Sequence, residues 1–239
     1  MKQLEGKTAI ITGGGLGIGK GIARAFTDEG ARIMIASRNE ERLSKVEEEL
    51  RSRGATVVSF PADVSREHDV LALFERTMKE FGRVDILVNC AGLIDQNPLE
   101  ETSLERWRKV IDVNLTGPFL CTREAFKIMR RQGGGRIVNV GSISAQMPRP
   151  QFAAYSSSKM GLVALTTTTA LEGRDCGIVA SCIHPGNVKT AMNELTQDEP
   201  AMEIEDVVRA VMVMVTMPPS VNMLQTIILP VTQLYLGRG

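Results

Sequence analysis

The chain has 239 residues, enough to bury a full hydrophobic core, and no break in composition marks a second domain, so we expect a single domain over residues 1–239. Lysine plus arginine equals aspartate plus glutamate at 28 each, which provides no net positive field for binding nucleic acid or an anionic membrane. The N-terminus lacks the apolar run of a signal peptide, and no stretch approaches the roughly 20 apolar residues of a membrane-spanning helix. These features favour a cytoplasmic protein that acts on small molecules.

Short apolar, β-branched runs alternate with longer amphipathic stretches, a pattern typical of parallel strands joined by helices. Glycines at 30, 54 and 82 are expected to end helices in the left-handed conformation, and Ser65 and Ser103 to cap helix N-termini. The sequence therefore predicts an α/β Rossmann fold, with a doubly wound, parallel, seven-stranded sheet and helices on both faces. The predicted strands are Thr8–Ile11, Arg32–Ala36, Thr56–Phe60, Ile86–Asn89, Arg136–Val140, Val179–Ile183 and Thr226–Leu229. The predicted helices are Ile18–Glu29, Glu40–Arg53, Glu67–Phe81, Leu104–Arg131, Ala154–Arg174 and Ile204–Met217.

The predicted helix Leu104–Arg131 carries more apolar residues than one buried face needs. Either it is enclosed within the monomer or it packs against another subunit. We favour the subunit interface, because helices form the outer layer of a doubly wound sheet. We therefore expect self-association through this helix and Ala154–Arg174, as a homotetramer or a dimer.

A glycine-rich turn follows the first predicted strand and leads into a helix. Glycines let backbone N–H groups approach a pyrophosphate closely, and the positive end of the helix dipole faces the anion. A turn selected only for packing is the alternative. The turn predicts a dinucleotide site made by Gly13, Gly15, Leu16, Gly17, Ile18 and Gly19.

The residues after the second predicted strand bear on which nicotinamide cofactor is bound. An acid at this point would bond the ribose 2′-hydroxyl and repel a 2′-phosphate. The chain instead has Ser37 and Arg38, a hydroxyl and a guanidinium that suit a phosphate. NADP(H) is therefore favoured over NAD(H), unless Arg38 is merely a solvated residue at a helix start.

Tyr155 and Lys159 are four residues apart, which places a phenol and an ammonium on one helix face. Carbonyl reduction develops negative charge on oxygen and needs a proton donor there. A nearby cation makes the phenol a better acid at neutral pH, and Ser142, at the carboxyl end of the fifth predicted strand, can hold the substrate oxygen. Such a pair is also common on protein surfaces, but the glycine turn and Ser142 favour the catalytic interpretation.

Pro118 has no N–H, so the carbonyl of Asn114 loses its helical hydrogen bond. A water could bridge this carbonyl to Lys159 and relay a proton. A kink near Gly117-Pro118 that only bends the helix is an equal alternative.

Together these motifs resemble the short-chain dehydrogenase/reductase family over nearly the whole chain. The resemblance rests on Thr12–Gly19, Asp63-Val64, Asn89–Gly92, Asn114, Ser142, Tyr155–Lys159 and Pro185-Gly186. It implies that Asn114, Ser142, Tyr155 and Lys159 are catalytic, and that Tyr155 and Lys159 also contact the cofactor. It further implies cofactor contacts at Asp63 and Val64 (adenine), Asn89, Ala91 and Gly92 (along the cofactor), and Pro185, Gly186, Val188 and Thr190 (nicotinamide). Cys90 departs from the pattern, since the family more often has a second asparagine there.

Cysteine and histidine are too few and too scattered for a zinc motif, so we expect no metal site. His184, beside Pro185-Gly186, is expected to be a structural residue whose ring nitrogens are satisfied. Apolar side chains at Met147, Phe152, Met192 and Leu195 could line a substrate pocket, although core packing explains them equally well.

The sequence favours an NADPH-dependent carbonyl (ketone) reductase with tyrosine as general acid/base. The alternatives are an NAD-dependent alcohol dehydrogenase and a 3-oxoacyl-[acyl-carrier-protein] reductase; the C-terminal residues 225–233 speak against the latter. An epimerase or dehydratase is disfavoured, because the sequence offers no second strong base near the predicted site. A non-catalytic dinucleotide-sensing regulator is the remote alternative.

Overall fold

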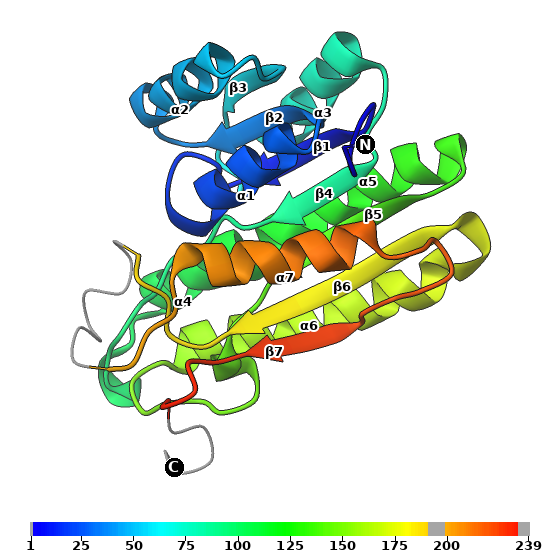
Figure 1. Cartoon of the computed structure of the whole chain (residues 1–239). Helices are drawn as coiled ribbons and strands as arrows, with labels where there is room; N and C mark the ends of the chain where they lie inside the picture. The colour runs from blue at the N-terminus through cyan, green and yellow to red at the C-terminus, as the bar shows by residue number, and fades with distance from the viewer. Residues whose placement is uncertain (1, 191–198, 234–239) are drawn as a thin grey trace.

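The computed structural model describes residues 2–190 and 199–233. Its strands form one parallel sheet in the order β3-β2-β1-β4-β5-β6-β7, with helices on both faces (Figure 1), as the sequence predicts. Each strand begins and ends within two residues of its predicted bounds. The strands are β1 (Thr8–Thr12), β2 (Arg32–Ser37), β3 (Val57–Pro61), β4 (Ile86–Asn89), β5 (Gly135–Val140), β6 (Ile178–Pro185) and β7 (Gln225–Ile228).

Two apolar cores lie on the two faces of the sheet. Side chains from α1, α2 and α7 build one core, and side chains from α3 and α5 build the other. In Figure 1, α1 and α7 cross one face while α5 and α6 cross the other. Because both faces are covered, β1 is buried along its whole length, and its three central residues, Ala9–Ile11, are all apolar. The helices are α1 (Gly17–Asp28), α2 (Glu40–Ser52), α3 (Glu67–Phe81), α4 (Leu104–Ile111), α5 (Gly117–Gln132), α6 (Ala153–Gly173) and α7 (Ile204–Thr216).

The stretch predicted as one helix, Leu104–Arg131, is divided. A π-helical turn over Asp112–Thr116 separates α4 from α5, and Pro118 lies in the first turn of α5. In a π-turn each carbonyl bonds the N–H five residues on, so the helix passes a residue that has no N–H. The break that the proline imposes therefore appears as a widened turn.

Part of the surplus apolar surface of this stretch is covered within the monomer. On its face of the sheet, α5 packs against α3 and α6, and α4 packs against α6. Phe119 of α5 nevertheless stays 44% exposed, and Leu104 at the start of α4 is 61% exposed. Packing within the monomer thus accounts for part of the surface, and the subunit interface stays a prediction for the rest.

The predicted helix caps are correct with one exception. Gly30, Gly54 and Gly82 all have positive φ, and the Ser103 hydroxyl accepts a hydrogen bond from the Arg106 N–H. Ser65 does not cap α3, because its hydroxyl donates to the Asp63 carboxylate instead; the N-cap position is held by Arg66.

The functional edge of the sheet follows from its strand order. Helical connections on opposite faces diverge between the adjacent strands β1 and β4, and open sheets of this type bind ligands in the crevice at the carboxyl ends of such strands. No helix in residues 2–190 and 199–233 is both long and apolar enough to cross a bilayer.

Candidate active site

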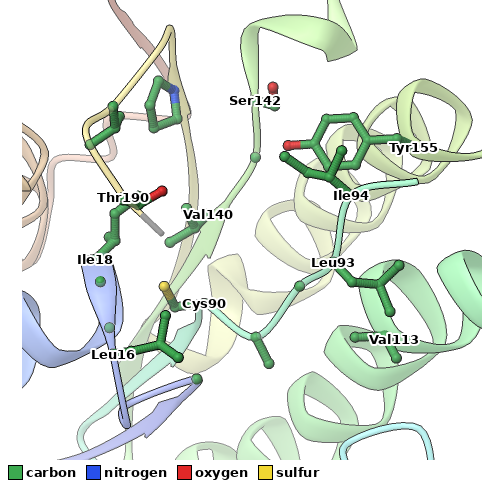
Figure 2. A pocket seen from close by; sticks show the side chains of 18 of the residues that line it. Leu16, Ile18, Cys90, Leu93, Ile94, Val113, Val140, Ser142, Tyr155 and Thr190 are labelled. Carbon is green, nitrogen blue, oxygen red and sulfur yellow. The ribbon is translucent and has the colours of Figure 1, made fainter. Parts of the chain in front are cut away.

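A cavity of about 690 Å³ opens at the carboxyl edge of the sheet. It extends from the glycine turn after β1, past the ends of β2 and β4, to the start of α6 (Figure 2). Nearly all the predicted site residues line it. They are Gly13, Gly15, Leu16, Gly17, Ile18, Gly19, Ser37, Arg38, Asp63, Val64, Ala91, Gly92, Ser142, Tyr155, Lys159, Pro185, Gly186, Val188 and Thr190.

Two glycines of the glycine turn, Gly13 and Gly19, have no room for a side chain. Gly13 has a φ of 71°, and a Cβ there would lie 2.9 Å from the backbone nitrogen of Ala91. A Cβ on Gly19 would collide with the Gly13 carbonyl oxygen. The turn is tied to β2 because the Gly13 N–H donates to the Ala36 carbonyl at 2.7 Å. This packing leaves a bare backbone cradle at the N-terminus of α1, which fits a pyrophosphate.

Beyond β2 the cavity wall is cationic and polar. Ser37 and Arg38, both predicted from the sequence, line it together with Asn39 and Arg42. The Asn39 side chain accepts a hydrogen bond from the Arg42 N–H and begins α2, which brings the first turn of that helix to the cavity. Sequence reasoning missed Arg42 as a residue of this wall. Its position three residues after Asn39, the N-cap of α2, could have indicated that it lies in the first helical turn, close to the end of β2.

Asp63 lies on the same wall, after β3. Its carboxylate accepts hydrogen bonds from the Ser65 N–H and hydroxyl at 3.0 and 2.6 Å. Burial alone would raise the pKa of Asp63, but these bonds, with the charges of Arg38 and Arg66, hold the pKa below its usual value. The carboxylate is therefore ionised and available as a hydrogen-bond acceptor at neutral pH.

At the other end of the cavity, α6 supplies a phenol and an ammonium. The Lys159 Nζ lies 5.6 Å from the centroid of the Tyr155 ring and donates to the Val140 carbonyl at 2.8 Å. Figure 2 shows the Tyr155 hydroxyl directed into the cavity with Ser142 beside it. Ser142 Oγ accepts from the Ser144 N–H at 3.1 Å, which leaves the Ser142 hydroxyl proton free to donate.

Asn114 is fully buried and does not line the cavity. Its amide accepts from the Leu93 N–H and donates to the Leu93 carbonyl, both at 2.9 Å, and donates to Ser158 Oγ at 3.2 Å. A Cβ on Gly92 would lie 3.4 Å from Asn114 Oδ1 and 3.8 Å from Lys159 Nζ, so both groups adjoin this glycine. The side chain joins the loop after β4 to α6. The proton relay through its backbone carbonyl stays a prediction.

Asn89 also lies outside the cavity lining. Its Nδ2 donates to Asn139 Oδ1 at 2.8 Å and to Thr122 Oγ1 at 3.2 Å, on the face of the sheet covered by α5 and α6. The side chain thus points away from the position predicted for the cofactor. The next residue, Cys90, does line the cavity, but burial raises the pKa of its thiol to about 12 in spite of the nearby charge of Lys159, so it remains protonated.

The turn after β4 is intact although Cys90 stands where the family more often has asparagine. The N–H groups of Cys90 and Ala91 both donate to Thr12 Oγ1, at 3.1 and 3.2 Å. The Thr12 hydroxyl on β1 therefore holds this turn through its backbone N–H groups, and these bonds need no asparagine side chain at position 90.

Beyond Tyr155 the cavity continues into a mixed apolar and polar region. Phe152 lines it as predicted, Met147 does not, and Met192 and Leu195 lie outside the described residues. Sequence reasoning missed Arg149, which pairs with Glu199 at 3.1 Å; Asn187 Nδ2 also donates to this carboxylate, at 2.6 Å. Other lining residues that it missed are Leu93, Ile94, Ile143, Ser144 and Asn187.

Metal chemistry has no visible support in the part of the chain that the structure describes. Within it, no group of three or more His, Cys, Asp or Glu side chains lies close enough together to hold a metal ion.

Comparison with known proteins agrees with this geometry. Residues 7–201 match the family model described as short chain dehydrogenase. An uncharacterised oxidoreductase from Thermotoga maritima is 42% identical over 79% of this chain and 74% of its own length. A 3-oxoacyl-[acyl-carrier-protein] reductase from a Synechocystis strain is 34% identical over 85% of this chain and 83% of its own.

Solved structures give the same result at the level of the fold. The crystal structure of 3-ketoacyl-(acyl-carrier-protein) reductase from Brucella melitensis, complexed with NADH, superposes with a TM-score of 0.89. It is 29% identical, and the match covers 95% of this chain and 98% of that one. Enzymes of this family act on alcohol or carbonyl groups with NAD(P)(H), and they commonly oligomerise. The chain belongs to the short-chain dehydrogenase family and is an oxidoreductase.

Proposed function

We propose that this protein is an NADPH-dependent carbonyl reductase. The observation that carries the proposal is one continuous cavity with two chemically different ends: Tyr155, Lys159 and Ser142 at one, Ser37, Arg38 and Arg42 at the other. The glycine turn between β1 and α1 fits a dinucleotide, because its backbone lies bare at the N-terminus of α1; Gly13 and Gly19 keep the turn this tight, since a Cβ at either would collide with protein backbone. The cationic end suits a 2′-phosphate.

The catalytic end is suited to protonating a developing alkoxide. Bound NADPH would supply the hydride. Ser142 donates a hydrogen bond to the substrate oxygen and holds it in place, and Tyr155 transfers the one proton that this oxygen needs as negative charge grows on it. The Lys159 ammonium lies 5.6 Å from the centroid of the Tyr155 ring, where its positive charge attracts the negative charge that develops during the reaction.

A second candidate is reduction of a 3-oxoacyl thioester. It is favoured by the Synechocystis and Brucella relatives, whose names state that activity. Because the Brucella enzyme was crystallised with NADH, NADH is the alternative cofactor for this protein. Both candidates use the same catalytic residues, so they differ only in substrate and cofactor.

Calorimetric titration with NADPH and NADH, followed by a carbonyl panel, tests the proposal. The panel would contain ethyl acetoacetate, 9,10-phenanthrenequinone and acetoacetyl-CoA, with consumption of reduced nicotinamide followed by absorbance. We expect tighter binding of NADPH and turnover of at least one ketone. Turnover of acetoacetyl-CoA alone would favour the second candidate, and no binding of either dinucleotide would refute both.

Tyr155→Phe is the matched control for the chemistry, because it keeps the ring and removes only the hydroxyl. We expect turnover to fall by about 100-fold or more, the usual contribution of a general acid, while NADPH affinity is nearly unchanged. An equal loss of turnover and of affinity would show that Tyr155 is a structural residue.

A further inference from the structure

His184, near the end of β6, is buried next to the catalytic residues yet lies outside the cavity lining. Its Nδ1 is 3.1 Å from the backbone carbonyl oxygen of Ser142, across the boundary between β5 and β6. A Cβ on Gly141 would lie 2.7 Å from the same nitrogen, so the ring rests against the end of β5. The imidazole therefore contacts the backbone that carries the Ser142 hydroxyl.

The geometry determines which ring nitrogen carries the proton. A carbonyl oxygen can only accept, so Nδ1 is the donor and the neutral ring has a bare Nε2. Burial and the charge of Lys159 lower the pKa of His184, and the bond to Ser142 acts in the opposite direction. The ring is therefore neutral at pH 7.

The expectation that both ring nitrogens are satisfied is wrong for Nε2. This atom is buried and has no hydrogen-bond partner among the residues that the structure describes. An unpaired buried polar atom is destabilising, and an apolar side chain of similar size would fill the space without that penalty. What the imidazole supplies here, and an apolar residue could not, is the Nδ1 bond to Ser142.

Several contacts fix the segment Val140–Ser142. Lys159 Nζ donates to the Val140 carbonyl at 2.8 Å, and the Gly141 N–H donates to the Ile183 carbonyl at 2.7 Å. His184 Nδ1 donates to the carbonyl of Ser142, two residues after Val140, which also accepts from the Ala145 N–H at 3.0 Å. Beyond this carbonyl the chain leaves the sheet and forms the 3₁₀ turn Ile143–Ala145, so His184 restrains the segment where strand pairing has ended.

We propose that His184 is a positioning residue for Ser142: its Nδ1–H···O bond fixes the backbone from which the Ser142 hydroxyl reaches the substrate oxygen. The inference rests on the proposed function, because it assigns Ser142 a role in carbonyl reduction. A displacement of about 1 Å at a reacting group can reduce a rate by roughly 100-fold, so restraint of this carbonyl has a kinetic consequence.

Nitrogen-15 NMR of the histidine side chains tests the bond without any turnover. The chain has two histidines, and His68→Gln leaves His184 as the only signal. We expect a neutral ring at pH 7 with a protonated Nδ1 and an unprotonated Nε2. A ring protonated on Nε2 alone would overturn the proposal, whatever the enzyme proves to reduce.

A double-mutant cycle tests the positioning role. Asn places an amide N–H near the position of Nδ1, whereas Gln reaches toward Nε2, so His184→Asn and His184→Gln are a matched pair. With NADPH and 9,10-phenanthrenequinone, we expect His184→Gln to lower kcat about 10-fold or more and His184→Asn to retain most of it. In a Ser142→Ala background, the same two variants should differ by less than about twofold, because a residue that acts through Ser142 has no further effect once the hydroxyl is gone.

The alternative outcomes are distinct. Equal losses of kcat in both backgrounds would show a purely structural role, and equal activity of the Asn and Gln variants would show that the Nδ1 bond is irrelevant; either overturns the proposal. If the wild-type enzyme reduces none of the carbonyls in the panel, the proposed function fails, and the NMR measurement still decides whether His184 holds Ser142.

Discussion

At the scale of single residues, the proposed preference for NADPH rests on two guanidinium groups near the end of β2. Arg38 follows the strand directly, and Arg42 comes from the first turn of α2; both line the cavity. Two cations converging on one wall can bind a phosphate more tightly than one, and Arg can bind it in bidentate fashion. Asp63 on the same wall partly offsets the charge of Arg38.

We expect Arg38→Asp to reverse the preference from NADPH to NADH, because a carboxylate accepts from the ribose 2′-hydroxyl and repels a 2′-phosphate. Arg42→Ala should weaken NADPH binding by about 10-fold and leave NADH binding nearly unchanged, in line with the loss of one charge-assisted bond. Calorimetric dissociation constants for both dinucleotides measure the two effects. An unchanged NADPH to NADH ratio in Arg38→Asp would mean that the 2′-phosphate is recognised elsewhere.

Sequence reasoning found the site residues whose chemistry is encoded by local spacing. Tyr155 and Lys159 follow from a four-residue helical separation, and the glycine turn follows from its place between a strand and a helix. It missed Arg42 and Arg149, because their approach to the cavity depends on how a helix or loop is placed in three dimensions. It also put Asn89 beside the cofactor, although the direction of a side chain at a strand end is settled by its neighbours, here Asn139 and Thr122.

At the scale of elements, the alternation of strands and helices was predictable to within two residues for every strand. Apolar periodicity carries this information because each element buries a continuous face. Periodicity did not reveal the π-turn at Asp112–Thr116, because apolar residues already cover more than one face of 104–131 and so hide the rotation of the buried face by about 100° that one extra residue produces. Pro118 was the only local signal of it.

We expect Pro118→Ala to lower turnover more than it weakens NADPH binding. The restored N–H can draw the π-turn back toward a regular helix, and Asn114 in that turn bonds both Leu93 and Ser158. Steady-state kcat for 9,10-phenanthrenequinone and the NADPH dissociation constant measure the two quantities. An unchanged kcat would argue against any role of this turn in proton relay and would support the simple bending of the helix.

At the scale of the whole molecule, apolar side chains remain exposed on α4, α5 and α6. We propose that these helices form the interface of a homotetramer or dimer, as expected from the surplus of apolar residues in 104–131. The exposed side chains are Leu104 (61%), Phe119 (44%), Met160 (52%) and Leu171 (53%). Because these side chains are already half buried, covering the rest against a second copy contributes about half of the 1.5–3 kcal/mol that full burial of each provides.

Phe119→Asp should therefore shift the protein to a smaller species in sedimentation velocity. Leu71→Asp on α3 is a matched control, because Leu71 is 45% exposed but lies on a helix outside the proposed interface. A monomeric wild-type protein, or equal effects of the two variants, would contradict the interface.

A network of hydrogen-bonded polar side chains lies between the sheet and the helices α5 and α6, next to the active site. Thr122 on α5 accepts from Asn89 on β4, Asn89 donates to Asn139 on β5, and Asn139 donates to Thr166 on α6 at 2.8 Å. Apolar contacts tolerate sliding, whereas the directional Asn89–Asn139 bond exists at only one alignment of β4 and β5. This bond thus fixes how far the two central strands extend relative to each other: a slip of one residue would break it and displace the loop after β4 from the loop after β5.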